Sequence, residues 1–250
     1  MNKLEDFFVG YLPFPAGLKP FYRLVVVAGL LLAVAGGIAL ASLQKSPSHS
    51  QWDTGAPMTV EGVLTMDPYP ILHRADVPDG EAMSVMLVQT GKFSADMAAE
   101  PYAGKRVSID GFGIRRGGWL MLEISGADAI QAVPESTDFV ALPAITPLGE
   151  VTLSGEVMDT KCFLGVMNPG SGQAHKACAE LCLLGGIPPM LAVKDAENRK
   201  FGYLLKTASG ESASLLVAEV AAESVEISGQ LERQGDMLYL RIADDQVVRR

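Results

Sequence analysis

The sequence predicts a mainly β protein: an N-terminal transmembrane helix followed by two tandem small β-barrels of the OB type, the second with a helical Cys/His insertion. Three observations predict this arrangement. An apolar run near the N-terminus carries no charge, two later segments repeat one strand pattern, and all three cysteines lie in a short stretch of the second segment.

The apolar run, residues 24–44, contains no charged side chain. A helix of that length, rising about 1.5 Å per residue, spans roughly the 30 Å hydrocarbon core of a bilayer. The segment 39–41 reads Ala-Leu-Ala, which resembles a signal-peptide cleavage site, so a cleaved signal peptide is the alternative. The run is longer than the usual hydrophobic region of a signal peptide, and more than twenty residues precede it, which favours an uncleaved anchor.

The flanking charges predict the orientation of this anchor. Lys3, Lys19 and Arg23 precede the run, whereas only Lys45 follows it closely. The positive-inside rule therefore predicts a cytoplasmic N-terminus and exported C-terminal domains, which places the chain in a bacterial inner membrane with its barrels in the periplasm.

A stripe of small residues along the predicted helix indicates contact with another transmembrane helix. The stripe has a four-residue spacing, which lets helix backbones approach closely in lipid. Its members are Gly29, Ala33, Gly37 and Ala41.

The formal net charge of −9 argues against a nucleic-acid partner, because an acidic surface repels phosphate backbones. The sequence also shows no Ser/His/Asp arrangement, no paired-carboxylate motif and no Gly-rich phosphate loop. No catalytic residue is predicted, and a non-catalytic subunit or binding module is favoured over an enzyme.

The repeat is clearest in two strand–turn–strand segments. KRVSIDGFGIRRGGWLMLEI from Lys105 aligns without gaps to ESVEISGQLERQGDMLYLRI from Glu223. The starts of the two units also match, with Gly62 on Gly155 and Tyr69 on Cys162. A middle strand, SVMLVQT in the first unit, is matched to PPMLAVKD in the second. Alternating strands with a mid-strand glycine predict a five-stranded barrel for each unit.

These patterns divide the chain into consecutive segments. The predicted segments are a cytoplasmic or interfacial leader (1–22), the transmembrane helix (23–43), a linker (44–57), the first OB-like barrel (58–131), a second linker (132–149), and the second OB-like barrel (150–248) with the Cys/His insertion (160–190).

The insertion contains a candidate metal site. If the segment KACAELCLL is helical, His175, Cys178 and Cys182 share one helix face, and Cys162 from the preceding loop completes a Cys3His set. Thiolates and an imidazole are the usual ligands of zinc, and copper or iron are the other candidates. A short insertion with little core of its own would gain folding energy from a bound metal.

Other interpretations of the cluster remain open. Cys162 bonded to Cys178 or Cys182 would form a disulfide, with the third cysteine left free. Alternatively, Lys161 and Lys176 would lower a thiol pKa and support thiol exchange. A third variant adds sulfur ligands for Cu(I) from the nearby methionines, which are Met158, Met167 and Met190.

Four other residues receive an interpretation. Asp159 either orients His175 or simply ends a strand. His73 in the first unit faces no cysteine, which favours a solvent or loop position. Trp119 is expected in the core, and Tyr69 occupies the position equivalent to Cys162.

The segment GEVMDTKC…HKACAELC…GGIPP, from Gly155 to Pro189, resembles a Cys/His motif of exported, membrane-anchored bacterial proteins of unassigned function. Such proteins tend to accompany respiratory or redox machinery in the membrane. The plan of one anchor followed by periplasmic OB barrels is also similar to that of the haem chaperone of cytochrome c maturation. That family carries haem on a histidine near the end of its barrel, and this chain has no histidine after His175, so only the architecture is implied.

Together these features predict a membrane-anchored periplasmic accessory or small subunit of a respiratory or redox assembly. Its barrels would dock a membrane-protein partner, and its Cys3His site would hold a structural zinc ion. The alternatives are a metal-handling or thiol-redox protein, whose cluster is the active element, and a disulfide-stapled binding module without metal.

Overall fold

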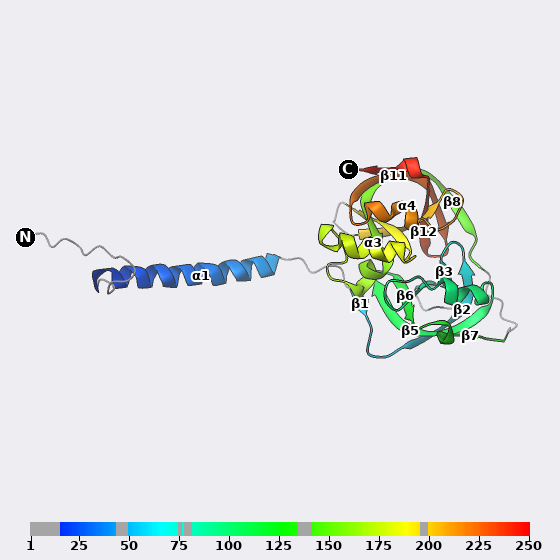
Figure 1. Cartoon of the computed structure of the whole chain (residues 1–250), viewed down its shortest axis with the longest axis horizontal. Helices are drawn as coiled ribbons and strands as arrows, with labels where there is room; N and C mark the ends of the chain where they lie inside the picture. Colours follow the sequence, from blue (N-terminus) through cyan, green and yellow to red (C-terminus); the bar gives the residue numbers. More distant parts are fainter. Residues whose placement is uncertain (1–15, 44–49, 75–76, 78–81, 135–141, 196–199) are drawn as a thin grey trace, which may run out of the picture. The chain divides into compact units, whose positions relative to one another are not determined.

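The computed structural model describes residues 16–43, 50–74, 77, 82–134, 142–195 and 200–250 (Figure 1). Its contacts divide the chain into two units, Met1–Pro47 and Ser48–Arg250.

The described part of the first unit, residues 16–43, is helical throughout. The 3-10 turn η1 (Ala16–Leu18) leads into α1 (Lys19–Leu43), and no residue of either is buried. The helix Ala16–Leu43 contains an apolar stretch long enough to cross a membrane. By length and composition the helix is suited to be a membrane anchor or a signal sequence, and it contains the predicted span 23–43. It also takes in residues 16–22 of the predicted leader, whereas residues 1–15 lie outside the described residues.

The second unit begins with a closed five-stranded barrel. Its strands are β2 (Met58–Met66), β3 (Pro70–His73), β4 (Ser84–Gln89), β5 (Arg106–Arg116) and β6 (Trp119–Ile124). Antiparallel pairs join β2 to β3, β3 to β4, β5 to β6 and β5 to β2, and a parallel pair between β4 and β6 closes the ring. Alternate residues of β5 face the interior, as its period-2 pattern predicts.

A second closed barrel repeats this order. Its strands are β8 (Ile145–Asp159), β9 (Pro189–Lys194), β10 (Lys200–Thr207), β11 (Ser224–Gln234) and β12 (Met237–Ile242). Here β10 and β12 form the parallel pair, and β8 pairs with β9 and β11. The prediction of a mainly β chain with two barrels is confirmed.

The marker glycines occupy equivalent places in the two barrels. A Cβ atom on Gly62 would lie 2.3 Å from the carbonyl oxygen of His73, and one on Gly155 would lie 2.7 Å from that of Ala192. Neither distance is sterically possible, so glycine is required where the first strand bends against the second.

The predicted match of the middle strands is wrong. SVMLVQ forms β4, which pairs in parallel with the last strand of its barrel, whereas PMLAVK forms β9, which pairs with the first strand β8. The true equivalents are β4 with β10 and β3 with β9. Short apolar runs resemble one another whatever their place in a barrel, and only the pairing distinguishes them.

Both predicted linkers contain strand residues. β1 (Ser50–Trp52) lies within 44–57 and pairs with β5, and β8 begins inside 132–149 and pairs with β11 from Ile145 to Glu156. Polar, proline-bearing stretches suggest loops by composition, but an edge of a barrel accepts a polar strand because one of its faces is in water.

Short helices and edge strands complete the unit. After β4 come α2 (Asp96–Ala99) and η2 (Glu100–Tyr102), and after β6 come η3 (Ala127–Ala129) and β7 (Ile130–Ala132). Between β8 and β9 lie η4 (Cys162–Val166), which is a π-helical turn, η5 (Gln173–His175) and α3 (Lys176–Leu184). After β10 come α4 (Ser214–Val217) and η6 (Ala218–Val220), and after β12 come η7 (Asp244–Gln246) and β13 (Val247–Arg249).

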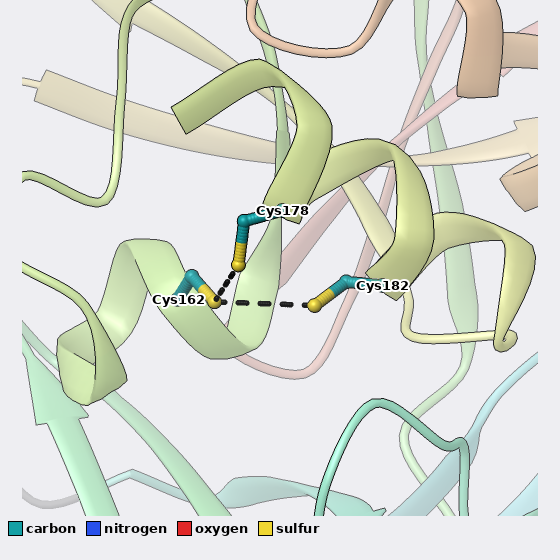
Figure 2. Close-up of side chains that lie close together, drawn as sticks. All are labelled: Cys162, Cys178 and Cys182. Atoms are coloured by element: carbon teal, nitrogen blue, oxygen red, sulfur yellow. Dashed lines mark hydrogen bonds between the residues drawn. The ribbon is translucent and has the colours of Figure 1, made fainter. Parts of the chain in front are cut away.

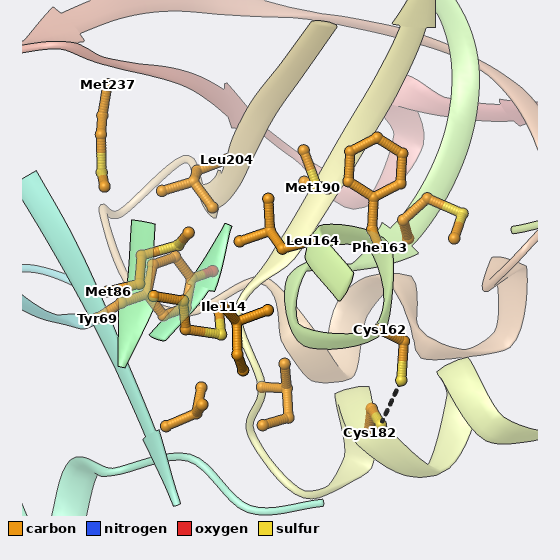
Figure 3. Close-up of a cluster of buried hydrophobic side chains, with 14 of the residues drawn as sticks. Tyr69, Met86, Ile114, Cys162, Phe163, Leu164, Cys182, Met190, Leu204 and Met237 are labelled. Carbon is orange, nitrogen blue, oxygen red and sulfur yellow. Dashed lines mark hydrogen bonds between the residues drawn. The ribbon is translucent and has the colours of Figure 1, made fainter. Parts of the chain in front are cut away.

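The barrels share a hydrophobic core. One cluster of buried side chains draws Tyr69, Met86 and Ile114 from the first barrel and Met190 and Leu204 from the second (Figure 3). The same cluster includes cysteines of the segment between β8 and β9. The cysteine segment therefore packs where the two barrels meet.

Candidate metal centre

The three cysteines converge although they come from two elements. Cys162 is the first residue of η4, and Cys178 and Cys182 lie one turn apart on α3. The Cys162 sulfur is 4.0 Å from that of Cys178 and 3.9 Å from that of Cys182, and the three sulfurs face one another (Figure 2). All three lie within 4.8 Å of one another, so the group can hold a metal ion.

The spacing of the sulfurs fits thiolate coordination. Sulfur ligands lie about 2.3 Å from zinc, so two sulfurs on one tetrahedral ion are separated by about 3.8 Å. The observed separations of 3.9 and 4.0 Å are close to that edge length. Cys162 and Cys182 are buried and Cys178 is half-buried, so one side of the group remains accessible.

His175 lies in a second group that shares Cys162. Its Nε2 atom is 3.0 Å from Oδ2 of Asp159, and the backbone N–H of Cys162 donates a hydrogen bond of 2.8 Å to Oδ1 of the same carboxylate. Asp159, Cys162 and His175 thus form a buried group that can also hold a metal ion. Asp159 both ends β8 and binds the histidine, so its two predicted roles coincide.

The predicted Cys3His set is therefore divided between two overlapping groups. His175 precedes α3 as its N-cap residue, and its ring binds Asp159. The three sulfurs form one group. Of the three cysteines, only Cys162 also belongs to the second group, with Asp159 and His175.

Lys92 of the first barrel reaches the cysteines, and the sequence analysis missed it. Its Nζ atom is 2.7 Å from the Cys178 sulfur and 3.4 Å from the Cys182 sulfur, and it donates a further hydrogen bond to the Cys178 carbonyl. Lys92 and Cys178 are 86 residues apart in sequence. The motif TGKF around Lys92 reads as an ordinary turn, so no local signal marks this lysine.

The two lysines expected near the thiols bind elsewhere. Lys161 is buried in an ion pair with Glu123, with Nζ 2.6 Å from the carboxylate, and donates to the carbonyls of Gln89 and Gly91. Lys176 pairs with Glu223. The hypothesis that these lysines lower a thiol pKa is wrong in this structure, because Lys92 takes that place.

The cysteines have unequal pKa values. The hydrogen bond between Cys162 and Cys182 raises the pKa of the Cys162 thiol, and burial and the Asp159 charge raise it further. The same hydrogen bond lowers the pKa of Cys182; burial and Asp159 oppose this effect, and Lys92 adds to it. The pKa of Cys162 is thus raised and that of Cys182 lowered by the same contact, and a metal ion at the sulfurs would displace the thiol protons.

Lys92 itself is held in its charged form. Burial alone would lower the pKa of Lys92, but the hydrogen bond to Cys178 and the charges of Cys182 and Cys178 outweigh burial and raise it. The ammonium group therefore balances negative charge on the sulfurs.

The disulfide and methionine alternatives find no support in the geometry. All three cysteines of the chain are described and free, and their sulfurs lie almost twice as far apart as the roughly 2.05 Å of a disulfide bond. Met158 and Met190 fill the core between the barrels, and Met167 is exposed.

The residues singled out in the first barrel have structural positions. His73 is buried on β3, where its ring contacts the hydroxyls of Thr65 and Ser84, so the predicted solvent or loop position is wrong. Trp119 packs against the shared core. The Tyr69 hydroxyl donates to the Leu205 carbonyl and accepts a hydrogen bond from the Ala213 N–H in the second barrel.

Comparisons of this chain with protein-family models, with curated proteins and with solved structures found no match. The function of the protein must therefore be inferred from the geometry of its site.

Proposed function

We propose that this protein is a membrane-anchored periplasmic accessory subunit of a respiratory or redox membrane assembly, whose barrels dock a partner and whose cysteine cluster holds a structural zinc ion. The observation that carries the metal assignment is the convergence of three cysteine sulfurs between two barrels, with the Cys162 sulfur 4.0 Å from that of Cys178 and 3.9 Å from that of Cys182. The anchor function is supported by the exposed apolar helix Ala16–Leu43.

An OB-like fold for both barrels is part of this proposal. The strand order supports it, since each barrel has five strands and a parallel pair between its third and fifth strands. We further propose that the helical segment between β8 and β9 is an insertion into this fold. The corresponding connection in the first barrel, between β2 and β3, contains only residues 67–69.

Zinc is the metal that the donor set supports best. Three cysteine thiolates and one cationic neighbour suit a divalent, borderline-soft ion in a structural site. His175 is the candidate fourth ligand. Its Nε2 is engaged by Asp159, and metal-binding histidines commonly hold a carboxylate through the ring nitrogen that does not bind the metal. The other ring nitrogen of His175 would then be the one that binds the metal.

Elemental mass spectrometry of the full chain in mild detergent, with a thiol count in denaturant, tests the metal centre. We expect about one zinc ion per chain and three reactive thiols. The Cys178→Ser variant should lose the metal and His175→Ala should bind it more weakly, whereas the control His73→Gln should retain it. A preparation without metal and with a single free thiol would instead identify a disulfide and refute the zinc site.

Co-purification from the native membrane in mild detergent tests the partner. An accessory subunit should migrate with larger membrane proteins, and replacing Gly37 in the small-residue stripe by leucine should weaken that association if α1 contributes to it. A lone, monodisperse species under every mild condition would contradict the accessory role.

A thiol-redox function is the second candidate, and the contact between Lys92 and Cys178 favours it. Cys178 is the most accessible of the three cysteines, and its sulfur lies 2.7 Å from the Lys92 Nζ atom, a contact typical of cysteines that take part in disulfide exchange. Metal-free protein should then be alkylated fastest at Cys178. Slow alkylation of all three cysteines in native, metal-free protein would exclude this function.

A further inference from the structure

We propose that Lys92 is the charge-balancing residue of the metal centre, supplied by the first barrel, so that binding of a divalent thiophilic cation ties the two barrels together. This inference rests on the proposed metal site and adds to it a residue, an ion class and a mechanical consequence.

The position of Lys92 carries the first step. Its Nζ atom contacts the sulfurs of both α3 cysteines and the carbonyl oxygen of Cys178. Those contacts cross from the first barrel to the segment between β8 and β9. The ammonium group therefore lies beside the same sulfurs that would bind the ion.

Charge balance indicates the class of ion. Counting only the sulfurs, the ion and Lys92, three thiolates and a divalent cation carry a net charge of about −1, which the Lys92 ammonium neutralises. A monovalent ion at the same sulfurs would leave one negative charge uncompensated. Two of the three cysteines are buried, and an unbalanced charge in such a site is costly. The set of three cysteines and one lysine thus favours a divalent thiophilic cation.

The turn that bears Lys92 docks firmly on the cysteine segment. The N–H of Ser94 donates a 2.9 Å hydrogen bond to the Gly185 carbonyl at the end of α3, and Gly91 accepts one of 2.7 Å from Lys161. A Cβ atom on Gly185 would lie 1.7 Å from the Lys92 carbonyl oxygen, so the two backbones are in direct contact. An ion that fixes the positions of the sulfurs would therefore also fix Lys92 and the turn that bears it.

The internal repeat shows that the lysine is particular to one barrel. An isolated bridge pairs Val88 with Ser94 in the first barrel, and the corresponding bridge in the second pairs Lys206 with Ser212. Counting from these bridges places Gly210 at the position equivalent to Lys92. Only the turn that faces the cysteines has a cation at this position, which fits a role toward the site.

The test measures zinc affinity of the full chain in detergent by competition with a chromophoric chelator. Lys92→Met should weaken zinc binding by about 10–100-fold, the usual effect of losing a residue that supports metal ligands. Lys92→Arg, which keeps the charge, should lose less. The matched control Lys176→Met removes a positive charge from the same segment, but that lysine pairs with Glu223, so affinity should not change.

Hydrogen exchange of residues 91–94 provides the second measurement. Zinc should slow exchange of the Ser94 amide in the wild-type chain, and this protection should be absent in Lys92→Met. Equal zinc affinity of Lys92→Met and the wild type, or equal losses in Lys92→Met and Lys92→Arg, would overturn the proposal, as would unchanged exchange on adding zinc. If the wild-type chain binds no zinc at all, the proposed metal centre itself fails, which is a distinguishable result.

Discussion

Cys162 is the residue that joins the two groups of the candidate site. Its sulfur faces Cys178 and Cys182, and its backbone N–H binds the Asp159 carboxylate that also holds His175. A single position thus links the sulfur cluster to the end of β8. The sequence places a tyrosine, Tyr69, at the equivalent position of the first barrel, so the two repeats carry chemically different side chains at this position.

His73 gives a pH-dependent prediction at the residue scale. Burial lowers the pKa of His73 below its ordinary 6.5, and the Asp236 charge only partly opposes this. The unfolded chain therefore binds the proton more readily than the folded one, so stability should fall as the pH drops below about 6.5. Denaturant unfolding followed between about pH 5 and 7 should show a shallower pH dependence in His73→Gln than in the wild type.

The comparison should be made on chain stripped of metal, because metal binding has its own pH dependence. Identical pH slopes for the wild type and His73→Gln would show that burial of this ring does not control acid stability.

At the scale of elements, the end of α3 is predicted from local sequence, but one of its glycines is required for a tertiary contact. The Gly185–Gly186 pair predicts the end of a helix, and α3 does end at Leu184, with Gly186 at a φ of 84°. Gly185 has an ordinary φ of −80°, so its conformation does not require glycine. Its requirement comes from the first barrel, whose Lys92 carbonyl occupies the space of a side chain.

Gly185→Ala should therefore destabilise the protein. The added methyl group must separate the Lys92 turn from the end of α3, at a cost of about 1–3 kcal/mol. Gly118→Ala is the matched control, because nothing lies within 4 Å of its Cβ position and its φ is not positive. Chemical denaturation of both variants measures the difference, and equal stabilities would argue against close packing of the turn on α3.

At the scale of the whole second unit, each barrel extends a side chain into the other from the same place in the repeat. Tyr69 follows β2 at the position equivalent to Cys162, one residue beyond the equivalent of Lys161, and binds Leu205 and Ala213 of the second barrel. Lys161 follows β8 and binds Gln89, Gly91 and Glu123 of the first. The exchange explains why Ser48–Arg250 forms one compact unit and not two independent domains.

The Lys161–Glu123 pair tests the importance of this exchange. Both side chains are almost completely buried, so Lys161→Met leaves a buried carboxylate without its partner. The free energy of unfolding should fall by about 3–5 kcal/mol. Changing Glu123 to leucine in the same chain should restore much of that loss, because the uncompensated charge is then gone.

A thermodynamic cycle of the two single variants and the double variant measures the coupling between Lys161 and Glu123. If the double variant is as unstable as the sum of the single changes, the two side chains are not coupled and this ion pair does not hold the barrels together.

Features that depend on local patterns can be predicted from the amino-acid sequence. An uncharged apolar run specifies a helix suited to a membrane, period-2 alternation and turn glycines specify β-barrels, and the spacing of Cys178 and Cys182 places them one turn apart on a helix. These signals are local because each depends on the period of a single element.

Which distant residues come into contact is known only from the folded chain. Folding brought Lys92 to the cysteines across 86 positions, buried His73, paired Lys161 with Glu123, and made β4 the equivalent of β10. Such contacts arise from packing between elements whose sequences carry no mutual signal. The cysteine cluster is therefore visible in the sequence. The lysine beside it, Lys92, and its place between the two barrels follow only from the folded chain.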